Sequence, residues 1–163
     1  MNQGQNLHQK ILNRSELQKK IQEWRSSGKK IVFTNGCFDI LHVGHIHSLL
    51  EAATTGDILI VAINSDASVK QLKGNDRPVN DEQARAFLLA SLSMVDAVTI
   101  FSELTPFELI ISIRPDVLVK GGDYKLDEIA GAKEVIESGG QVIINPIVQG
   151  YSTTDIIKKL QNL

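Results

Sequence analysis

The sequence predicts an α/β fold: a doubly wound, Rossmann-like sheet of five parallel strands with helices on both faces. Two observations carry this prediction. Five short apolar runs, rich in Val and Ile, are typical of buried strands, and stretches of helical spacing lie between them. Strands that alternate with helices are joined by right-handed βαβ crossovers, which build a parallel sheet.

Length and composition limit the classes of protein open to this chain. Its 163 residues suit one domain, and 42% apolar with 22% charged residues is ordinary globular composition. Seventeen Lys and Arg residues against nineteen Asp and Glu residues give a net charge of −2. This balance excludes a general nucleic-acid binder. The single cysteine, Cys37, excludes an internal disulfide.

The hydropathy of the chain gives no sign of a membrane protein. The longest apolar run, residues 58–63, is far shorter than a membrane span. The N-terminus is polar and has no signal-peptide stretch. We therefore expect no membrane contact and a cytoplasmic location.

The N-terminal part of the chain is expected to hold a tail and one helix. Residues rich in Asn and Gln predict a flexible tail over residues 1–12, followed by a single domain over residues 13–163. Asn13 and Glu16 have the spacing of a capping box at the start of the first helix. Its apolar residues follow at helical spacing, namely Leu17, Ile21 and Trp24.

The same patterns predict the remaining elements. Strands are expected at residues 31–33, 58–63, 97–100, 117–119 and 142–144. Helices are expected near residues 46–53, 82–92, 106–113, 128–137 and 154–160. The longest break between elements, residues 65–80, is polar and cationic, and long loops inside compact domains are often functional.

Four segments that follow strands are rich in Gly, His, Lys, Asp, Ser and Thr. Doubly wound sheets bind ligands beyond the carboxyl ends of their strands, so we expect these segments to form the functional site. They are residues 34–45, 64–78, 120–124 and 150–154.

The first of these segments, TNGCFDILHVGH (residues 34–45), contains the sharpest motif. Gly36 directly follows the first strand and lets a ligand approach the backbone. His42 and His45 are three residues apart, so they share one face in the first turn of a helix. Gly44 is expected to leave room between them for a bulky anion. Because a helix N-terminus attracts phosphate, the motif favours a phosphate site.

Two other interpretations of this motif stay open. In one, the two histidines are hydrogen-bonded within the protein and cap a turn. In the other, they bind zinc together with Asp39, which supplies the third protein ligand that zinc requires. Cys37 is expected to be a packing residue and His47 a surface residue. Dinucleotide-binding, P-loop and nucleophile-elbow motifs are absent from the sequence.

The long polar break and the helix after it supply further cations. Lys70, Lys73 and Arg77 are candidates to clamp a triphosphate or a sugar phosphate, the alternative being an ordinary solvated face. Arg85 is either another clamp or a surface arginine.

Two later segments add groups of the same kind. Lys120 follows the fourth strand beside a glycine pair, where it is either part of a turn or a phosphate ligand. Ser152, Thr153 and Thr154 open the last helix, either as ordinary caps or as a cradle for an anion.

Taken together, these segments resemble the cytidylyltransferase-like branch of the nucleotidyltransferase superfamily, which is defined by H-x-G-H after the first strand. Within that branch the chain closely resembles the adenylyltransferases that make ADP-heptose from D-glycero-β-D-manno-heptose 1-phosphate. The resemblance covers about residues 30–161. It is carried by TNGCFDILHVGH (34–45), NSDASVKQLKGNDRPVN (64–80), RPDVLVKGGDY (114–124) and STTDIIKK (152–159).

The resemblance implies a reaction, a cofactor and partners. AMP passes from ATP to heptose 1-phosphate and pyrophosphate leaves, in the synthesis of a precursor of the lipopolysaccharide core or a related glycan. Mg²⁺ accompanies the ATP, without a set of protein ligands. A homodimer is implied. A separate upstream sugar kinase is also implied, because relatives that carry a fused kinase need more than 163 residues.

The resemblance also implies roles for individual residues. The catalytic residues are His42, His45, Lys73 and Lys120. The nucleotide-binding residues are Thr34, Asn35, Gly36, Cys37, Phe38, His42, Gly44, His45, Asn64, Lys120, Gly121, Asp123, Ser152, Thr153 and Thr154. The residues expected on the substrate phosphate are Asp39, Lys70, Lys73, Arg77 and Arg85. Asp39 is also a candidate to orient a histidine or a water molecule.

The sequence is also compatible with three alternative functions. The first is a CTP-dependent cytidylyltransferase acting on glycerol 3-phosphate or a similar small phosphate. Such enzymes carry R-T-x-G-I-S-T before the last helix, and Ile147 and Val148 stand at the Arg and Thr positions here. The second is a non-catalytic nucleotide-binding module on the same fold. The third is a metal-dependent hydrolase that uses His42, His45 and Asp39.

Overall fold

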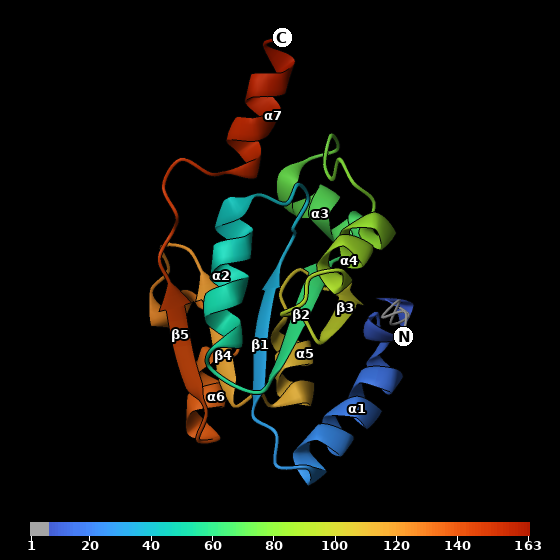
Figure 1. Cartoon of the computed structure of the whole chain (residues 1–163). Coiled ribbons are helices and arrows are strands. Elements are labelled where there is room, and N and C mark those ends of the chain that lie inside the picture. The colour runs from blue at the N-terminus through green and yellow to red at the C-terminus, as the bar shows by residue number, and fades with distance from the viewer. Residues whose placement is uncertain (1–6) are drawn as a thin grey trace.

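The computed structural model describes residues 7–163, in which five parallel strands form one sheet in the order β3-β2-β1-β4-β5 (Figure 1). The strands are β1 (Ile31–Gly36), β2 (Ile58–Asn64), β3 (Ala97–Phe101), β4 (Val117–Gly121) and β5 (Gln141–Asn145). The predicted fold class, the five strands and their parallel pairing are confirmed.

Helices cover both faces of the sheet (Figure 1). The α-helices are α1 (Arg14–Ser26), α2 (Val43–Ala53), α3 (Asp66–Lys73), α4 (Glu82–Ala90), α5 (Phe107–Ile113), α6 (Ala132–Glu137) and α7 (Thr153–Gln161). Two short 3₁₀ helices are η1 (Leu7–Lys10) and η2 (Leu126–Glu128). Within residues 7–163, no helix has both the length and the apolar character needed to cross a membrane.

Residues of the central strands alternate between two hydrophobic cores. Phe33 and Ile60 pack in the core that includes residues of α1, α5 and α6. Val32 and Val61 pack in the core that includes residues of α2 and α4. Because both faces are covered, the central strands are apolar throughout, which is why the sequence pattern identifies them.

The order of the strands creates the site. From β1 the chain moves outward to β2 and β3, and it then crosses to β4 and β5 on the other side of β1. The strand order therefore reverses between β1 and β4. A crevice opens at the carboxyl ends of strands at such a point, and it is where doubly wound sheets bind their ligands.

Residues 65–80 are not one long loop, as the sequence predicted. Their first half forms α3, which Ser65 caps by accepting a hydrogen bond from the backbone N–H of Ser68 across 3.2 Å. Val69 is the one buried apolar residue of this eight-residue helix. A helix so short shows too little of the helical repeat to be recognised from its apolar residues.

The helix predicted over residues 128–137 also starts later than expected, at Ala132. Gly131 adopts a left-handed φ of +78°, which a side chain would strain, and a Cβ there would lie 2.8 Å from Cγ2 of Ile110. Of the predicted helical residues before Ala132, Glu128 is the last residue of η2 and residues 129–131 form a bend and a turn.

Residues 7–12, predicted as part of a flexible tail, are held against the domain. The backbone N–H of Leu12 donates to the carbonyl oxygen of Val98 across 2.8 Å, and Nζ of Lys10 donates to the carbonyl oxygen of Val95 across 2.8 Å. The remaining residues of the predicted tail, 1–6, lie outside the described part of the chain.

Candidate active site

A cavity of about 940 Å³ lies at the carboxyl ends of the strands. Every residue predicted to bind the nucleotide lines it, and so does Lys73, the one predicted catalytic residue outside that set. The four segments expected to form the site therefore contribute to one cavity, at the top of the sheet in the view of Figure 1.

His42 and His45 form the centre of this cavity. His42 is the N-cap of α2 and His45 lies in its first turn. Their rings stack with centroids 3.8 Å apart and planes inclined by 21°. The Nδ1 atoms of both rings are buried and find no hydrogen-bond partner within residues 7–163. The interpretation of two internally satisfied histidines is therefore wrong, since buried polar atoms without partners are rare and need a ligand or another explanation.

The protein keeps both imidazoles neutral. Burial lowers the pKa of His42 below its usual value. Burial, together with the charges of the neighbouring His42 and Lys73, lowers the pKa of His45 to about 4. Near pH 7 each ring therefore carries one N–H donor and no charge, ready to bind a phosphate oxygen.

Gly44 makes room for the His42 ring and not, as predicted, for an anion. A Cβ at this position would lie 3.0 Å from Cε1 and Nδ1 of His42 and 3.4 Å from Cβ of Tyr151. The space left by the missing side chain is therefore taken by the His42 ring, which can stack on His45, rather than kept open for an anion.

Two lysines add positive charge to the cavity. Lys73 ends α3, and its charge acts on His45. Lys120 lies near the end of β4, and its Nζ is 5.2 Å from the centroid of the Tyr124 ring. Burial lowers the pKa of Lys120, and the charge of Lys73 lowers it further, against the opposite effect of Cys37. The two lysines bring positive charge from α3 and from β4 into one cavity.

Arg85, predicted as a phosphate clamp, is completely buried and faces the protein. Its guanidinium donates to the carbonyl oxygens of Asn80 and Cys37 across 3.0 and 2.7 Å and to the carboxylate of Asp66 across 2.8 Å. All three of its nitrogens are occupied by the protein. The prediction that Arg85 binds substrate phosphate is therefore wrong, and the residue ties α4 to the histidine turn, residues 37–45.

Asp39 and Arg77, also predicted on the substrate phosphate, bind each other. Nε of Arg77 donates to the Asp39 carboxylate across 2.6 Å, and the backbone N–H groups of Val79 and Asn80 donate to it across 2.8 and 3.0 Å. Burial alone would raise the pKa of Asp39, but these N–H groups and Arg77 outweigh it and hold the pKa below the usual value. Asp39 therefore fixes a loop, and within residues 7–163 its carboxylate accepts hydrogen bonds from Arg77, Val79 and Asn80 and from no histidine.

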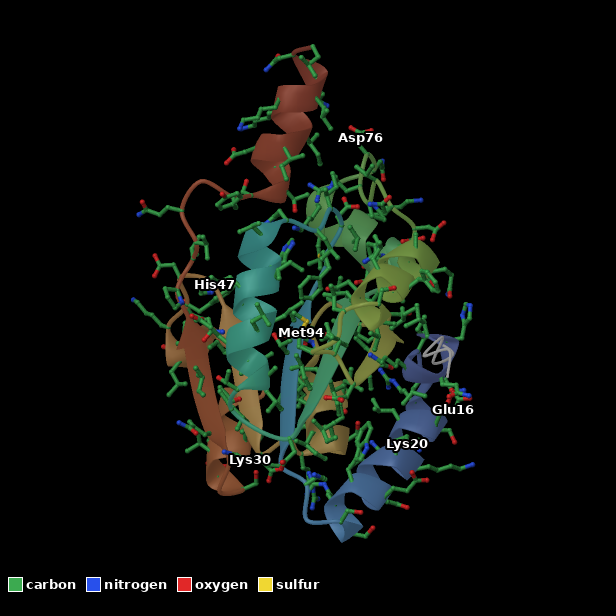
Figure 2. The ribbon with its side chains drawn as sticks, viewed as in Figure 1. Glu16, Lys20, Lys30, His47, Asp76 and Met94 are labelled. Carbon is green, nitrogen blue, oxygen red and sulfur yellow. The ribbon has the colours of Figure 1, made fainter. Side chains whose placement is uncertain are left out.

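The remaining predicted cation, Lys70, lies one turn before Lys73 on α3. Its side chain is exposed, and it is outside the lining of the cavity. The loop after α3, with Asp76 at its outer end, extends away from the sheet, and His47 lies on the outer side of α2 (Figure 2). His47 is exposed, as predicted, and its Nδ1 lies 3.3 Å from the Glu51 carboxylate.

The hydroxyl residues before α7 both cap the helix and line the cavity. Oγ of Ser152 accepts a hydrogen bond from the backbone N–H of Asp155 across 3.0 Å, which is an ordinary N-cap. Oγ1 of Thr153 donates to the carbonyl oxygen of Ile40 across 3.3 Å. The last helix is thus attached to the histidine turn, and its N-terminus faces the cavity.

The zinc interpretation of the histidine motif is wrong. Among the residues that the structure describes, no three His, Cys, Asp or Glu side chains gather into a group that could hold a metal ion. Asp39, the proposed third ligand, gives its carboxylate to Arg77 and to two backbone N–H groups. The structure therefore gives no support to a metal-dependent hydrolase built on His42, His45 and Asp39.

Several cavity residues were not predicted from the sequence. They include residues 104–106 after β3, residues 128–130 at the end of η2 and just beyond it, residues 146–148 after β5, and Ser48. The loops after β3 and β5 could have been found, because all parallel strands end at the same edge of the sheet. Ser48 lies inside α2, and no feature of the sequence marks it.

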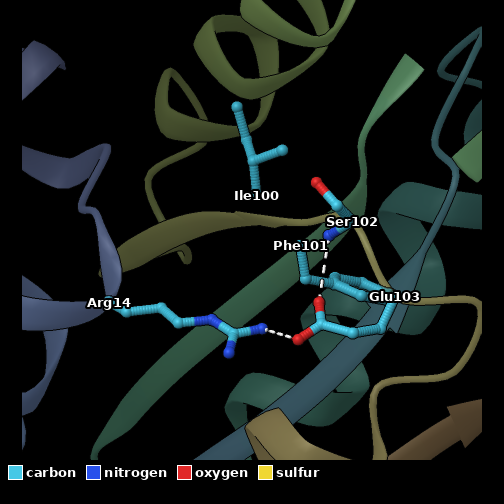
Figure 3. A pocket seen from close by; sticks show the side chains of 5 residues that line it. All are labelled: Arg14, Ile100, Phe101, Ser102 and Glu103. Atoms are coloured by element: carbon cyan, nitrogen blue, oxygen red, sulfur yellow. Dashed lines mark hydrogen bonds and ion pairs between the residues drawn. The ribbon is translucent and has the colours of Figure 1, made fainter. Parts of the chain in front are cut away.

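A smaller hollow of about 410 Å³ lies at the end of β3 (Figure 3). Its two charged residues, Arg14 and Glu103, form an ion pair with each other, and the backbone N–H of Ser102 also donates to the Glu103 carboxylate. The charges of this hollow are therefore already paired, in contrast to the unpartnered histidine atoms of the larger cavity.

Known proteins resemble this chain in sequence. It is 57% identical over 150 residues to the bifunctional protein HldE of Koribacter versatilis, a match covering 92% of this chain and 31% of that protein. It is 49% identical over 160 residues to HldE of Caulobacter vibrioides, covering 98% of this chain and 33% of that protein. The chain thus spans about a third of the length of these relatives.

Solved structures resemble it as well. The lipopolysaccharide core biosynthesis protein from Thermoplasma volcanium GSS1 aligns with a TM-score of 0.61 and 34% identity, over 77% of this chain and 100% of that one. Pantoate-beta-alanine ligase from Francisella tularensis aligns with a TM-score of 0.57 and 19% identity, over 94% of this chain and 78% of that one. The second likeness shows the fold alone.

The sequence profile of one family matches residues 33–159, a stretch that contains the stacked histidines, both cavity lysines and the hydroxyl residues before α7. The resemblance seen in the sequence is confirmed, and the chain belongs to the cytidylyltransferase-like family.

Proposed function

We propose that this protein transfers AMP from ATP to the phosphate of heptose 1-phosphate, giving ADP-heptose and pyrophosphate. One observation carries the proposal. Two stacked, neutral histidines with unpartnered Nδ1 atoms lie at the N-terminus of α2, beside Lys73, in a cavity large enough for a nucleotide and a sugar. The relatives named HldE and a lipopolysaccharide core biosynthesis protein support a role of this reaction in the synthesis of the lipopolysaccharide core.

The chemistry needs positioning and charge stabilisation more than acid–base catalysis. The attacking oxygen of the sugar phosphate is already an anion, so it forms its bond to the α-phosphorus of ATP without a general base while the bond to pyrophosphate breaks. Bringing two polyanions into line and stabilising the charge on the transferred group are then the main tasks. His42, His45, Lys73 and Lys120 supply fixed donors for that charge, and such donors are usually the largest catalytic contribution.

Mg²⁺ enters this proposal with the nucleotide. It neutralises charge on the phosphates when bound, and phosphate oxygens and water molecules are its expected ligands. A homodimer, a separate sugar kinase upstream and a cytoplasmic location, where ATP is available, remain part of the proposal.

The choice of ATP over CTP rests on the resemblance. Ile147 and Val148 line the cavity at positions where CTP-dependent relatives carry Arg and Thr. The absence of this Arg and Thr pair favours the adenylyltransferase over the cytidylyltransferase.

The function is tested by crossing four nucleoside triphosphates with a set of sugar 1-phosphates and glycerol 3-phosphate in the presence of Mg²⁺, with pyrophosphate release as the readout. We expect release with ATP and heptose 1-phosphate. Release with CTP and glycerol 3-phosphate would instead identify a cytidylyltransferase. Nucleotide binding without release for any pair would identify a non-catalytic binding module.

A further inference from the structure

The large cavity reaches across the edge of the sheet from one face to the other. Leu49, which lines it, belongs to the core that includes residues of α2 and α4. Ile129, which also lines it, belongs to the core that includes residues of α1, α5 and α6. The cavity therefore passes over the carboxyl ends of the strands, with His42 and His45 on the side of α2. We call the part on the other face, lined by residues 104–106 and 128–130, the distal lobe.

The chemistry of the distal lobe differs from that around the histidines. Its six residues include no cation, one hydroxyl group on Thr105, one carboxylate on Glu128 and otherwise aliphatic groups. A carboxylate repels phosphate groups and accepts hydrogen bonds from hydroxyl groups. The distal lobe is therefore unsuited to a triphosphate and suited to the uncharged, hydroxyl-bearing part of a substrate.

The Glu128 carboxylate is held in place with acceptor capacity to spare. Oε2 accepts a hydrogen bond from the backbone N–H of Lys125 across 2.9 Å, as part of a capping box on η2. Glu128 is exposed to the cavity, and no hydrogen bond to its Oε1 is found within residues 7–163. A carboxylate fixed through one oxygen presents the other to a ligand without a large loss of side-chain freedom.

The distal lobe and the phosphate-binding centre, by which we mean the part of the cavity around His42, His45 and Lys73, belong to one cavity. Asn64 at the end of β2 lines the cavity, and its Oδ1 lies 3.7 Å from Sγ of Cys37 in the histidine turn. Leu72 and Lys73 at the end of α3 also line it. A substrate whose phosphate lies near Lys73 can therefore extend its remaining atoms toward Thr105 and Glu128.

We propose that the distal lobe binds the sugar of the acceptor substrate, and that Glu128 and Thr105 determine its specificity by hydrogen bonding to sugar hydroxyl groups. This inference rests on the proposed function, because it assumes an acceptor that is a sugar phosphate. It places the nucleotide on the side of α2 and α7 and the sugar on the side of α5 and η2. The acceptor phosphate then lies between them, where it can attack the α-phosphorus.

The test compares Glu128→Gln and Thr105→Val with Asp127→Asn, a matched control on the same 3₁₀ turn whose residue is exposed and outside the cavity lining. Glutamine keeps the capping hydrogen bond, since Gln serves at this position of a capping box, and loses only the charge. We expect each of the first two variants to raise the KM for heptose 1-phosphate about tenfold or more and to leave the KM for ATP unchanged, as loss of a hydrogen bond to a ligand would do. The control should change neither KM.

Different results overturn different statements. An active wild-type enzyme in which Glu128→Gln and Thr105→Val leave the KM for the sugar phosphate unchanged would refute the distal lobe as the sugar site. An equal rise in both KM values would also refute it, since the residues would then act on the cavity as a whole. Absence of turnover in the wild type with every sugar phosphate would instead refute the proposed function itself.

Discussion

Arg85 and Cys37 are joined by a hydrogen bond of 2.7 Å from Nη1 of the arginine to the backbone carbonyl oxygen of the cysteine. The bond ties a fully buried cation on α4 to the turn that carries the stacked histidines. The same guanidinium reaches Asp66 at the start of α3, the helix that ends at Lys73. One side chain therefore connects the histidine turn and α3, both of which line the large cavity.

This connection predicts a large loss of stability when Arg85 is removed. In Arg85→Ala, two partly buried carbonyl oxygens and the Asp66 carboxylate lose their donor. Breaking a buried ion pair costs about 3–5 kcal/mol, and because the Asp66 side chain is 33% exposed we expect the lower end, about 3 kcal/mol. We expect the free energy of unfolding, measured by urea denaturation, to fall by about that amount. Lys20→Ala, which breaks an exposed ion pair with Glu23, is the control and should change it by less than about 1 kcal/mol. A loss equally small for Arg85→Ala would contradict the structural role assigned to the arginine.

The sequence predicted the strands well because their physical signal is local and strong. Val32 and Phe33 point to opposite faces, yet both are buried, so an unbroken apolar run was enough to identify β1. The helix α3 was missed because its signal, a serine cap and one buried valine, is short. The start of α6 was predicted too early because Gly131 has a left-handed φ and no room for a side chain. The residue that takes that room, Ile110, lies more than 20 residues earlier in the sequence, so no local pattern reveals it.

The sequence could predict which segments lie together at the cavity, but not the direction of each side chain. Segments that follow parallel strands must meet at one edge of the sheet, so the histidines, Lys73 and Lys120 could be placed in one cavity from the sequence. The direction of a side chain depends on tertiary contacts. Lys70, Lys73 and Arg85 are alike as cations in the sequence. Lys70 and Lys73 are both exposed but only Lys73 lines the cavity, whereas Arg85 is buried.

This difference between Lys73 and Lys70 gives a matched pair of variants. Lys73→Gln removes a charge that faces His45 in the cavity, whereas Lys70→Gln removes an exposed charge one turn earlier on the same helix. We expect Lys73→Gln to lower kcat/KM by at least about tenfold, since hydrogen bonds to charged groups contribute about 1.5–3 kcal/mol, and Lys70→Gln to change it less than about twofold. Steady-state pyrophosphate release measures both. Equal losses in the two variants would mean that general positive charge on α3, rather than one placed lysine, attracts the nucleotide.

The lowered pKa of His45 predicts a dependence of stability on pH. The imidazole titrates near 6.5 when the chain is unfolded and near 4 when it is folded. Between these values the unfolded state binds more protons, so the free energy of unfolding rises with pH. The contribution is complete above about pH 6.5 and is lost as the pH falls through about 4.

Urea denaturation at pH 4.5 and pH 7 isolates this contribution when the wild type is compared with His45→Gln. Asp39, whose pKa is also lowered, contributes in the same direction to both proteins, so only the difference between them reports on His45. We expect a smaller change between the two pH values in the variant. An identical change in both proteins would show that His45 is not held neutral by the fold.

The stacked histidines predict a loss of turnover rather than of folding when His45 is replaced. In His45→Ala a preorganised donor to the charge on the transferred phosphoryl group is lost, and removal of one such donor costs about 2.7–4 kcal/mol, or at least about 100-fold in kcat. Since the imidazole has a buried Nδ1 without a partner within residues 7–163, its removal breaks no hydrogen bond of that atom, and the urea midpoint near pH 7 should change little. His47→Ala, on the exposed side of the same helix, is the control and should keep wild-type turnover. Near-normal pyrophosphate release by His45→Ala would remove the histidine from the mechanism. A large drop in its urea midpoint would assign it a structural role instead.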